Sequence, residues 1–385
     1  MFAIPRRARW AVPAGALVIT GGIMAGSLIS VAQAAPALPS RTPAQLLAAV
    51  AAGQGPALTG TVVETASLGL PALPGNSDPT SIASLLTGSH TIKVWYASPE
   101  HYRLALPGSL SETDVVRDGS TVWLWQSTAD AVTEMSVPAH AAAPPTLVPS
   151  LTPQQAAKLV LAAVGPTTSV SVDSNVTVAG QPAYELVLAP KDARSLVGQV
   201  RIAVDGHNAV PLRVQVFARG ATNPTSPAIS VGFTSVSFAA PAPSEISFTP
   251  PPGAKITKVN PDQNGAGPQE STPAVRTIGS GWLTVVDLPS SALNSGTPAS
   301  GPVSANQTSG EGAAALQALL GSAKFVHGTW GFGRLLRTSL VSVLMTTTGT
   351  TFVGAVQPSV LYAAASHAAP AHGPVAHPAM APAAP

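Results

Sequence analysis

Hydrophobic and polar residues alternate along much of the chain, most clearly between residues 168 and 240. A period of two places successive side chains on opposite faces of a β-strand. Within each run one parity is apolar: Val170, Val172, Val176 and Val178; Tyr184, Leu186 and Leu188; Val200, Ile202 and Val204; Leu212, Val214 and Val216. The residues between them are mainly Ser, Thr, Glu, Gln, Arg and Asp. The pattern therefore predicts an antiparallel sheet with one dry face and one solvated face.

Shorter strands are predicted upstream, at 59–67, 90–97 and 102–106. Further along, two apolar segments flank Asp118-Gly119, a two-residue sequence that favours a β-hairpin. A meander of neighbouring strands is the simplest arrangement for this order.

Two features interrupt the alternation near its end. The apolar parity changes between Phe233 and Val236, which predicts a bulge or a bend. Strand pairing is expected to stop at residues 250–252, because three successive prolines lack a backbone donor.

Three helices are predicted from a capping residue followed by proline at the first helical position. They are expected at 44–52, 79–86 and 153–164, after Thr42-Pro43, Asp78-Pro79 and Thr152-Pro153. A sheet of about ten strands curls, and helices must cover its dry face. We therefore predict an α+β fold: a half-open, curved antiparallel β-barrel with helices covering its mouth.

A smaller α+β domain is predicted at the C-terminal end, over residues 278–365. Its expected elements are a strand at 281–288, a helix at 313–320, a hairpin of 339–345 with 351–356, and a helix from 358. Pro, Gly, Ser, Asn and Ala enrichment predicts linkers at 138–151 and 260–277, a mobile loop at 289–312, and a disordered Ala/Pro/His tail at 366–385.

The N-terminal residues 1–34 have the pattern of a secretory signal peptide. Arg6, Arg7 and Arg9 precede an apolar stretch that ends in Ala32-Gln33-Ala34, an A-x-A cleavage pattern. An uncleaved membrane anchor is the alternative, because the uncharged stretch is long enough to span a bilayer. The protein is thus expected to be exported, periplasmic or otherwise extracytoplasmic, and membrane-associated if the segment is retained.

Composition excludes several classes of protein. Among 385 residues there is no Cys, which rules out disulfide scaffolds, thiol enzymes, Cys-ligated metal sites and acylation at a lipobox. Only 9% of residues are charged, and the small net charge of +2 comes from the N-terminal arginines, so no nucleic-acid surface is predicted.

Catalytic and metal-binding motifs are missing from the sequence. There is no G-x-S-x-G, no H-E-x-x-H, no EF-hand loop, and no Gly-Lys-Ser/Thr after the Gly-rich segment at 328–333. His367, His372 and His377 suit either weak metal binding or simple solvation of a tail. We predict no enzyme activity, no cofactor and no metal site.

Four segments, in this order, resemble the family of the lipoprotein carrier LolA and the sensor RseB. They are Tyr96–Arg103, Val116–Trp125, Val178–Leu188 and Phe248–Ala254. The resemblance covers residues 42–259, and Gly333–Leu344 with Thr347–Val356 resemble the smaller second domain of RseB. LolA lacks such a domain.

The resemblance implies an apolar cavity that holds acyl chains between the sheet and the helices. The residues expected to line it are Tyr96, Tyr102, Leu104, Leu106, Trp123, Trp125, Met135, Tyr184, Leu186, Val214, Val216 and Phe233. The alternative is that these residues fill a solid core, and that the two tryptophans serve ordinary hairpin packing.

Three functions follow as hypotheses. The first is an exported protein that binds a lipid or an acylated lipoprotein without catalysis. The second, implied by the RseB resemblance, is an envelope sensor whose C-terminal domain binds a membrane-bound anti-sigma factor. An exported hydrolase is the third, and no motif supports it.

Overall fold

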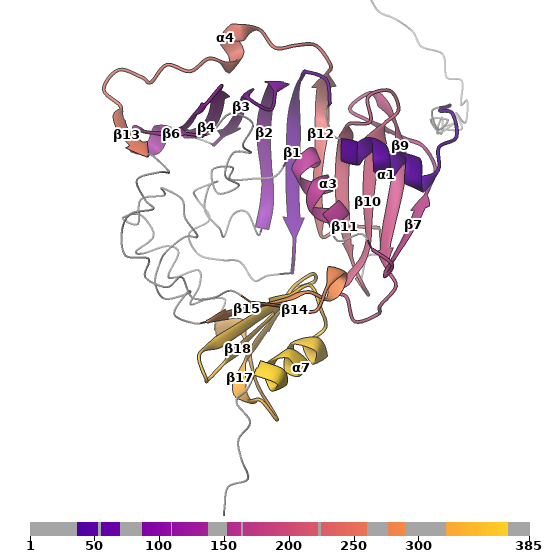
Figure 1. The fold of residues 1–385 in the computed structure, drawn as a ribbon. Helices are drawn as coiled ribbons and strands as arrows, with labels where there is room; N and C mark the ends of the chain where they lie inside the picture. Colours follow the sequence, from indigo (N-terminus) through magenta and orange to yellow (C-terminus); the bar gives the residue numbers. More distant parts are fainter. Residues whose placement is uncertain are drawn as a thin grey trace, which may run out of the picture. The chain divides into compact units, whose positions relative to one another are not determined.

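The computed structural model contains two β-sheets with flanking helices (Figure 1). It describes residues 37–52, 55–69, 87–108, 110–137, 152–162, 165–221, 225–259, 276–289 and 321–368. The predicted signal peptide, the helices at 79–86 and 313–320, the linker at 138–151 and most of the loop at 289–312 lie outside these residues.

The first sheet has 13 strands. They are β1 (Leu58–Ser67), β2 (Thr87–Ser98), β3 (His101–Pro107), β4 (Glu112–Asp118), β5 (Thr121–Gln126), β6 (Ala131–Ser136), β7 (Thr168–Val172), β8 (Val176–Val178), β9 (Gln181–Pro190), β10 (Val197–Asp205), β11 (Pro211–Ala218), β12 (Ile229–Ser237) and β13 (Lys255–Val259). Their order is β13-β6-β5-β4-β3-β2-β1-β12-β11-β10-β9-β7, and β8 also pairs with β9. The sheet is large, curved and not closed, as expected for a half-open barrel.

Local sequence signals explain how these strands are connected. The predicted hairpin at Asp118-Gly119 is confirmed: β4 and β5 pair directly, and Gly119 has a φ of 63°, which glycine adopts without strain. The predicted irregularity near Phe233 is also confirmed. Val62 pairs with Phe233 but Thr61 pairs with Ser235, so Thr234 is the extra residue of a bulge.

Pairing resumes after the prolines, which the sequence analysis did not predict. A four-residue helix, α4 (Pro243–Ile246), follows β12 and contacts strands β2, β3 and β4. Beyond Gly253 the chain regains backbone donors, and the Lys255 N–H donates to Asp130 O at 2.8 Å. Strand β13 then pairs in parallel with β6 at the edge of the sheet.

Two helices, α1 (Pro43–Ala52) and α3 (Pro153–Ala162), pack on the first sheet. Both begin with the same N-terminal capping arrangement. In α1 the Thr42 N–H donates to Gln45 Oε1 at 2.9 Å, and the Gln45 N–H donates to Thr42 Oγ1 at 3.3 Å. Thr152 and Gln155 repeat this exchange at 2.8 and 3.3 Å. These reciprocal bonds satisfy donors that a helix N-terminus otherwise leaves unpaired.

The second sheet has six strands, and helix α7 packs on it. They are β14 (Arg276–Ile278), β15 (Val285–Pro289), β16 (Lys324–Gly328), β17 (Gly331–Arg337), β18 (Ser342–Thr346), β19 (Thr350–Gly354) and α7 (Pro358–Ala368). The order is β14-β15-β19-β18-β17-β16. Leu361, Ala364 and Ala365 of α7 pack with Leu344 and Phe352 on one face of this sheet.

Residues 281–283 correct one expectation for this sheet. The predicted strand at 281–288 begins as a 3-10 turn, η4 (Gly281–Leu283), and becomes extended only at Val285. Gly281 has a φ of 57°, and the Trp282 indole N–H donates to Thr168 Oγ1 at 2.8 Å. A further 3-10 turn, η1 (Ser127–Ala129), joins β5 to β6.

Loops of the two sheets are hydrogen-bonded to each other. The Leu196 N–H donates to Ala355 O at 2.9 Å, and the Gln357 N–H donates to Arg194 O at 2.7 Å. Leu340, in the β17–β18 turn, belongs to the same buried cluster as Leu46 of α1. The second sheet therefore shares core contacts with the first.

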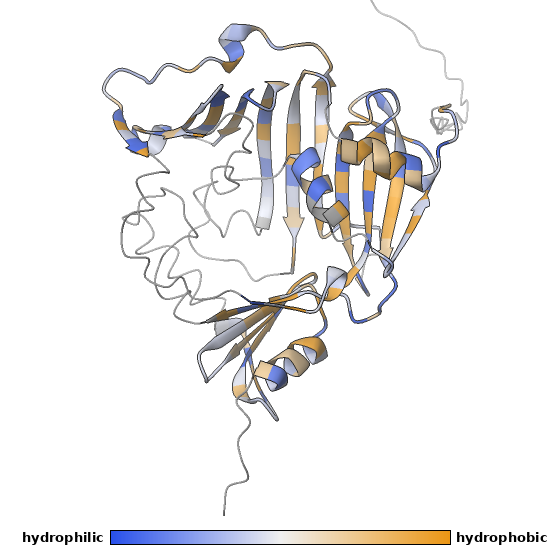
Figure 2. Ribbon diagram, viewed as in Figure 1, coloured by the Kyte–Doolittle hydropathy of each residue, from blue (hydrophilic) through white to orange (hydrophobic). Residues whose placement is uncertain are grey.

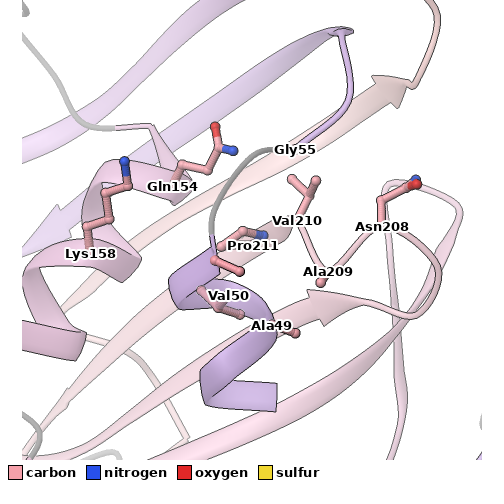
Figure 3. Close-up of a pocket in the computed structure, with 10 residues that line it drawn as sticks. Ala49, Val50, Gly55, Gln154, Lys158, Asn208, Ala209, Val210 and Pro211 are labelled. Carbon is pink, nitrogen blue, oxygen red and sulfur yellow. The ribbon is translucent and has the colours of Figure 1, made fainter. Parts of the chain in front are cut away.

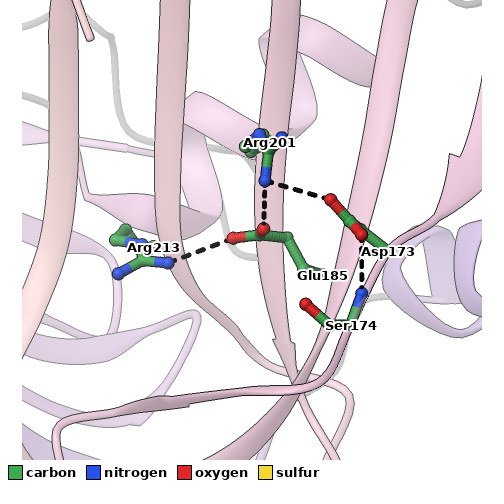
Figure 4. Close-up of polar contacts among 5 residues, drawn as sticks. All are labelled: Asp173, Ser174, Glu185, Arg201 and Arg213. Carbon is green, nitrogen blue, oxygen red and sulfur yellow. Dashed lines mark hydrogen bonds and ion pairs between the residues drawn. The ribbon is translucent and has the colours of Figure 1, made fainter. Parts of the chain in front are cut away.

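A buried carboxylate is the centre of an ion-pair network on strands β9, β10 and β11 (Figure 4). Glu185 accepts from Arg201 at 2.6 Å and from Arg213 at 3.1 Å, and Arg201 also reaches Asp173 at 3.2 Å. The Arg213 side chain lies over Gly232, where a Cβ would come within 3.0 Å of its Cγ. These charged side chains project from the polar face of the strands, on the side opposite to Leu186 and Ile202.

Removing the central carboxylate should destabilise the protein more than removing the peripheral one. Glu185→Ala leaves two arginines facing each other, and we expect a loss of about 3 kcal/mol. Asp173→Ala removes an exposed pair and should lose less than about 1 kcal/mol. Urea unfolding of the two variants and the parent measures both values; equal losses would contradict the central role of Glu185.

Candidate functional site

The first sheet has one continuous apolar face, which we call the inner face because α1 and α3 pack on it. Cross-strand pairing connects it residue by residue: Leu186 lies opposite Ile202, Ile202 opposite Val214, and Val214 opposite Val231. On β1 and β2 the next partners of Val231 are Glu64 and His90, and the apolar surface continues beside them through Phe233, Val62 and Ile92. Figure 2 shows hydrophobic and hydrophilic residues alternating along β1 and β10.

The register places most of the predicted lining residues together on the inner face. These are Tyr96, Tyr102, Leu104, Leu106, Met135, Tyr184, Leu186, Val214, Val216 and Phe233. Residues that are more than a hundred positions apart in the sequence thus share one surface, because antiparallel pairing preserves the face of each partner.

Most buried residues of the inner face belong to two clusters. Over β9 to β12, Leu46 and Val50 of α1 and Ala156 and Ala157 of α3 pack on Leu186 and its neighbours. Over β1 to β6, a second cluster includes Val94, Leu104, Val115 and Leu124. The small side chains of α3 let the helix approach the sheet closely.

The inner face is shielded from solvent. Leu186 is 0% exposed, Leu106 3% and Phe233 7%, whereas Tyr96, Tyr102 and Val216 are half-buried. These side chains therefore contact other protein atoms rather than open solvent.

A few polar groups interrupt the apolar surface. Glu64 and His90 lie directly opposite each other on β1 and β2, and both are buried. Buried Arg117 lies opposite Tyr102, and its Nε donates to Gly119 O at 3.1 Å. Burial raises the pKa of the Tyr102 hydroxyl, and Arg117 partly offsets this. Such groups supply hydrogen bonds and one positive charge at a limited number of points.

A hollow of about 140 Å³ lies where α1 and α3 meet the turn between β10 and β11 (Figure 3). It is lined by Ala49, Val50, Ala52, Gly55, Gln154, Lys158, Asn208, Ala209, Val210 and Pro211. A hollow of this size holds roughly one benzene-sized group. Val50 also belongs to the buried cluster of the inner face, so the hollow adjoins that face.

This hollow was not predicted from the sequence. None of the predicted lining residues takes part in it, because it is formed by helix residues and a turn rather than by alternating strand positions. One signal was available: Gln154 and Lys158 are four residues apart and therefore share one side of α3.

Trp123 and Trp125 lie on the opposite, outer face, which corrects their predicted place in the lining. Trp123 pairs with Val116, and Trp125 pairs with Asp114, whereas the inner-face residue of this strand is Leu124. The Trp123 ring contacts Phe248, with 6.0 Å between ring centroids. Phe248 follows α4, so Trp123 packs against the segment that connects β12 to β13.

Asp114 is a buried carboxyl on the same outer face. It is 1% exposed, and Arg103 donates to its Oδ2. Its Oδ1 has no hydrogen-bond partner among the residues that the structure describes. Burial raises the pKa of Asp114 to about 6, although Arg103 acts in the other direction. This site lies away from the inner face, so we interpret it as a determinant of stability.

No group of three or more metal-ligating side chains occurs among the described residues. Within the same part of the chain, every helix is too short or too polar to span a membrane.

Comparison with known proteins gives likenesses to solved structures only. No family model matches the sequence, and no curated protein matches it. The chain is similar to the Pseudomonas aeruginosa MucA/MucB complex structure, with 17% identity, 84% of this chain and 95% of that chain covered, and a TM-score of 0.40.

Two further structures show a similar relationship. A LolA superfamily protein from Nitrosomonas europaea matches at 10% identity, covering 54% of this chain and 99% of its own, with a TM-score of 0.21. An uncharacterized conserved protein from Thermus thermophilus matches at 10% identity, covering 56% and 98%, with a TM-score of 0.33.

The raised pKa of Asp114 predicts a specific pH dependence of stability. Its folded pKa of about 6 exceeds the ordinary value of 3.8, so the stabilising contribution is complete below about pH 4 and is lost as the pH rises through 6. Relative to Asp114→Asn, the parent should lose roughly 2 kcal/mol of unfolding free energy between pH 4.5 and 7.5. Urea titrations across this range measure the difference.

Asp130→Asn provides the matched control, because Asp130 is an exposed carboxyl and Asn readily adopts its φ of 44°. This variant should keep the parent's pH slope. If the unfolding free energy of the Asp114→Asn variant depended on pH in the same way as that of the parent, Asp114 would be ionised throughout this range.

Proposed function

We propose that this protein is exported and binds a lipid or an acylated ligand, such as a lipoprotein, without catalysis. The observation that supports this function is the continuous apolar inner face, with α1 and α3 packed on it. A surface of this kind recognises hydrocarbon by area and shape, and it needs few polar groups.

The energetics suit a long apolar chain. Each buried methylene contributes about 0.8 kcal/mol, so a twelve-carbon chain gains about 10 kcal/mol before the cost of opening the protein. Opening separates α1 and α3 from the sheet. Their buried contacts are made by Leu46 and Val50 of α1 and by Ala156 and Ala157 of α3, so the energy of opening comes mainly from the two larger side chains of α1.

The hollow between α1, α3 and the β10–β11 turn is the proposed starting point of binding. It is an existing gap beside the cover of the inner face, and Val50 both lines it and belongs to the buried cluster that contains Leu46. Lys158 at its rim is exposed and positively charged, which suits the carboxylate or phosphate end of an amphiphile.

The first test is whether the protein carries a lipid. Native mass spectrometry of gently purified protein should show bound lipid, and a dansyl-labelled undecanoate should bind with increased fluorescence. Protein that is free of lipid and does not change the fluorescence of this probe would contradict the proposed function.

The second test fills the hollow. Ala49→Phe places a phenyl ring in a space that holds about one such group, and we expect at least about tenfold weaker probe binding. Ala48→Phe is the matched control, because Ala48 lies on the exposed side of the same helix and should leave affinity unchanged. Equal affinity in both variants would show that the chain enters elsewhere.

A second candidate function is an envelope regulator that binds a membrane protein, such as an anti-sigma factor, through residues 278–365. The second sheet favours it, because its strands carry apolar residues on both parities: Leu344 and Phe352 face α7, while Val343 and Val353 lie on the other face. Strands that are apolar on both faces are typical of sheets covered on both sides.

This candidate is tested by co-purification from envelope extract. Val343→Ser with Val353→Ser should abolish recovery of one stoichiometric membrane partner. The Ala49→Phe variant, altered only at the hollow of the first sheet, should retain that partner. If both variants retained the partner, the result would count against the regulator function.

A further inference from the structure

Strands β16 and β17 present two exposed phenyl rings on one side of the second sheet. Phe325 is 79% exposed and Phe332 is 69% exposed. Cross-strand pairing sets Phe325 opposite Arg334, and His327 opposite Phe332, so the four side chains share one face. We call these four residues, together with the neighbouring Met345, the aromatic patch.

The opposite side of the same hairpin fixes this orientation. The Trp330 side chain folds over Gly328 and Gly333, where an added Cβ would come within 2.6 and 3.1 Å of its ring. Trp330 then stacks on Tyr362 of α7, with 5.6 Å between ring centroids. Because the aromatic core of the hairpin lies on this side, Phe325 and Phe332 must project from the other.

Aromatic and cationic groups alternate within the aromatic patch. The Arg334 guanidinium lies 4.6 Å from the centroid of the Phe325 ring, and the His327 and Phe332 rings are 6.1 Å apart. A hollow of about 510 Å³ opens among them, lined also by Val326, Gly333, Thr346 and Thr347. Adjacent exposed rings of this size are unusual on a monomer that faces only water.

Charge favours an anionic occupant. Within residues 276–289 and 321–368, Asp287 is the sole carboxylate side chain, and it pairs in register with Phe352, on the side that packs against α7. No carboxylate among these residues shares the face of the patch. Arg334 thus provides positive charge beside the two rings.

We infer that the aromatic patch docks the protein on an anionic phospholipid surface. Phe325 and Phe332 would enter the boundary between headgroups and acyl chains, where aromatic rings are favoured, while Arg334 contacts lipid phosphates. Projecting rings suit insertion into a bilayer. A groove that binds a peptide usually has its aromatic side chains recessed, so the patch does not have the shape of such a groove. The inference goes beyond ligand binding by the inner face and uses different residues.

The test is co-sedimentation of the full chain with vesicles of about 30% phosphatidylglycerol and about 70% phosphatidylcholine. The parent should bind these vesicles and bind pure phosphatidylcholine several-fold more weakly. Phe325→Ser with Phe332→Ser should reduce the partition coefficient at least about tenfold, because both rings lose their burial in lipid. Phe332→Trp should retain binding, since Trp also favours the interface.

Two matched controls separate the patch from general effects. Arg334→Gln should remove most of the phosphatidylglycerol dependence, whereas Arg337→Gln should not, because Arg337 is exposed on the other face of the same strand. Leu110→Ser removes a fully exposed apolar side chain of the first sheet and should leave vesicle binding unchanged.

Several outcomes would overturn the inference. They are no sedimentation of the parent, binding that survives the double Phe substitution, or a parent dimer that the same substitution dissociates while vesicles remain unbound. Failure here is distinguishable from failure of ligand binding, because the double Phe variant should still bind dansyl-undecanoate and Ala49→Phe should still bind vesicles.

Discussion

The register between β1 and β12 is the constraint on which the rest of the first sheet depends. At this junction the apolar side chains of β9 to β12 meet those of β1 to β6. A register shift of one residue would move the apolar side chains of one half to the opposite face of the sheet. The bulge at Thr234 sets Phe233 opposite Val62 and keeps both rows on one face. Gly60 helps to fix the same register, since a Cβ there would lie 2.5 Å from Ser235 O and 2.9 Å from the Phe233 ring.

A continuous inner face also determines where the charges lie. Glu185, Arg201 and Arg213 use the outward positions of the strands that carry Leu186, Ile202 and Val214 inward. Arg103 and Asp114 do the same beside Leu104 and Val115. The protein thus combines a low charge content with buried ion pairs, which hold neighbouring strands together on one face and leave the other face apolar.

The sequence predicted those features that depend on residues near each other in the chain. Alternation, the Asp118-Gly119 turn and the Thr-Pro starts of α1 and α3 were sufficient to find most strands, two helices and the inner parity. Trp123 and Trp125 were misplaced because aromatic content was given more weight than parity: Leu124 already marked the inward position. Strand β13 was missed because the stretch at 255–259 is short and carries two lysines, and only its place beside β6 makes it a strand.

The inner face is covered and the aromatic patch is exposed, and both arrangements suit a protein that is proposed to meet hydrocarbon. A protein that binds hydrocarbon must hide its apolar surface from water until hydrocarbon is present, and must meet hydrocarbon with some apolar surface already exposed. Leu340 belongs to the cluster that holds α1 on the sheet, and the Ser339 N–H donates to Leu68 O at 2.9 Å. Because this turn joins β17 to β18, lifting α1 from the inner face would remove packing from the strand that carries Phe332 and Arg334. Ligand binding and surface docking nevertheless use separate residues, so a variant that loses one is expected to keep the other.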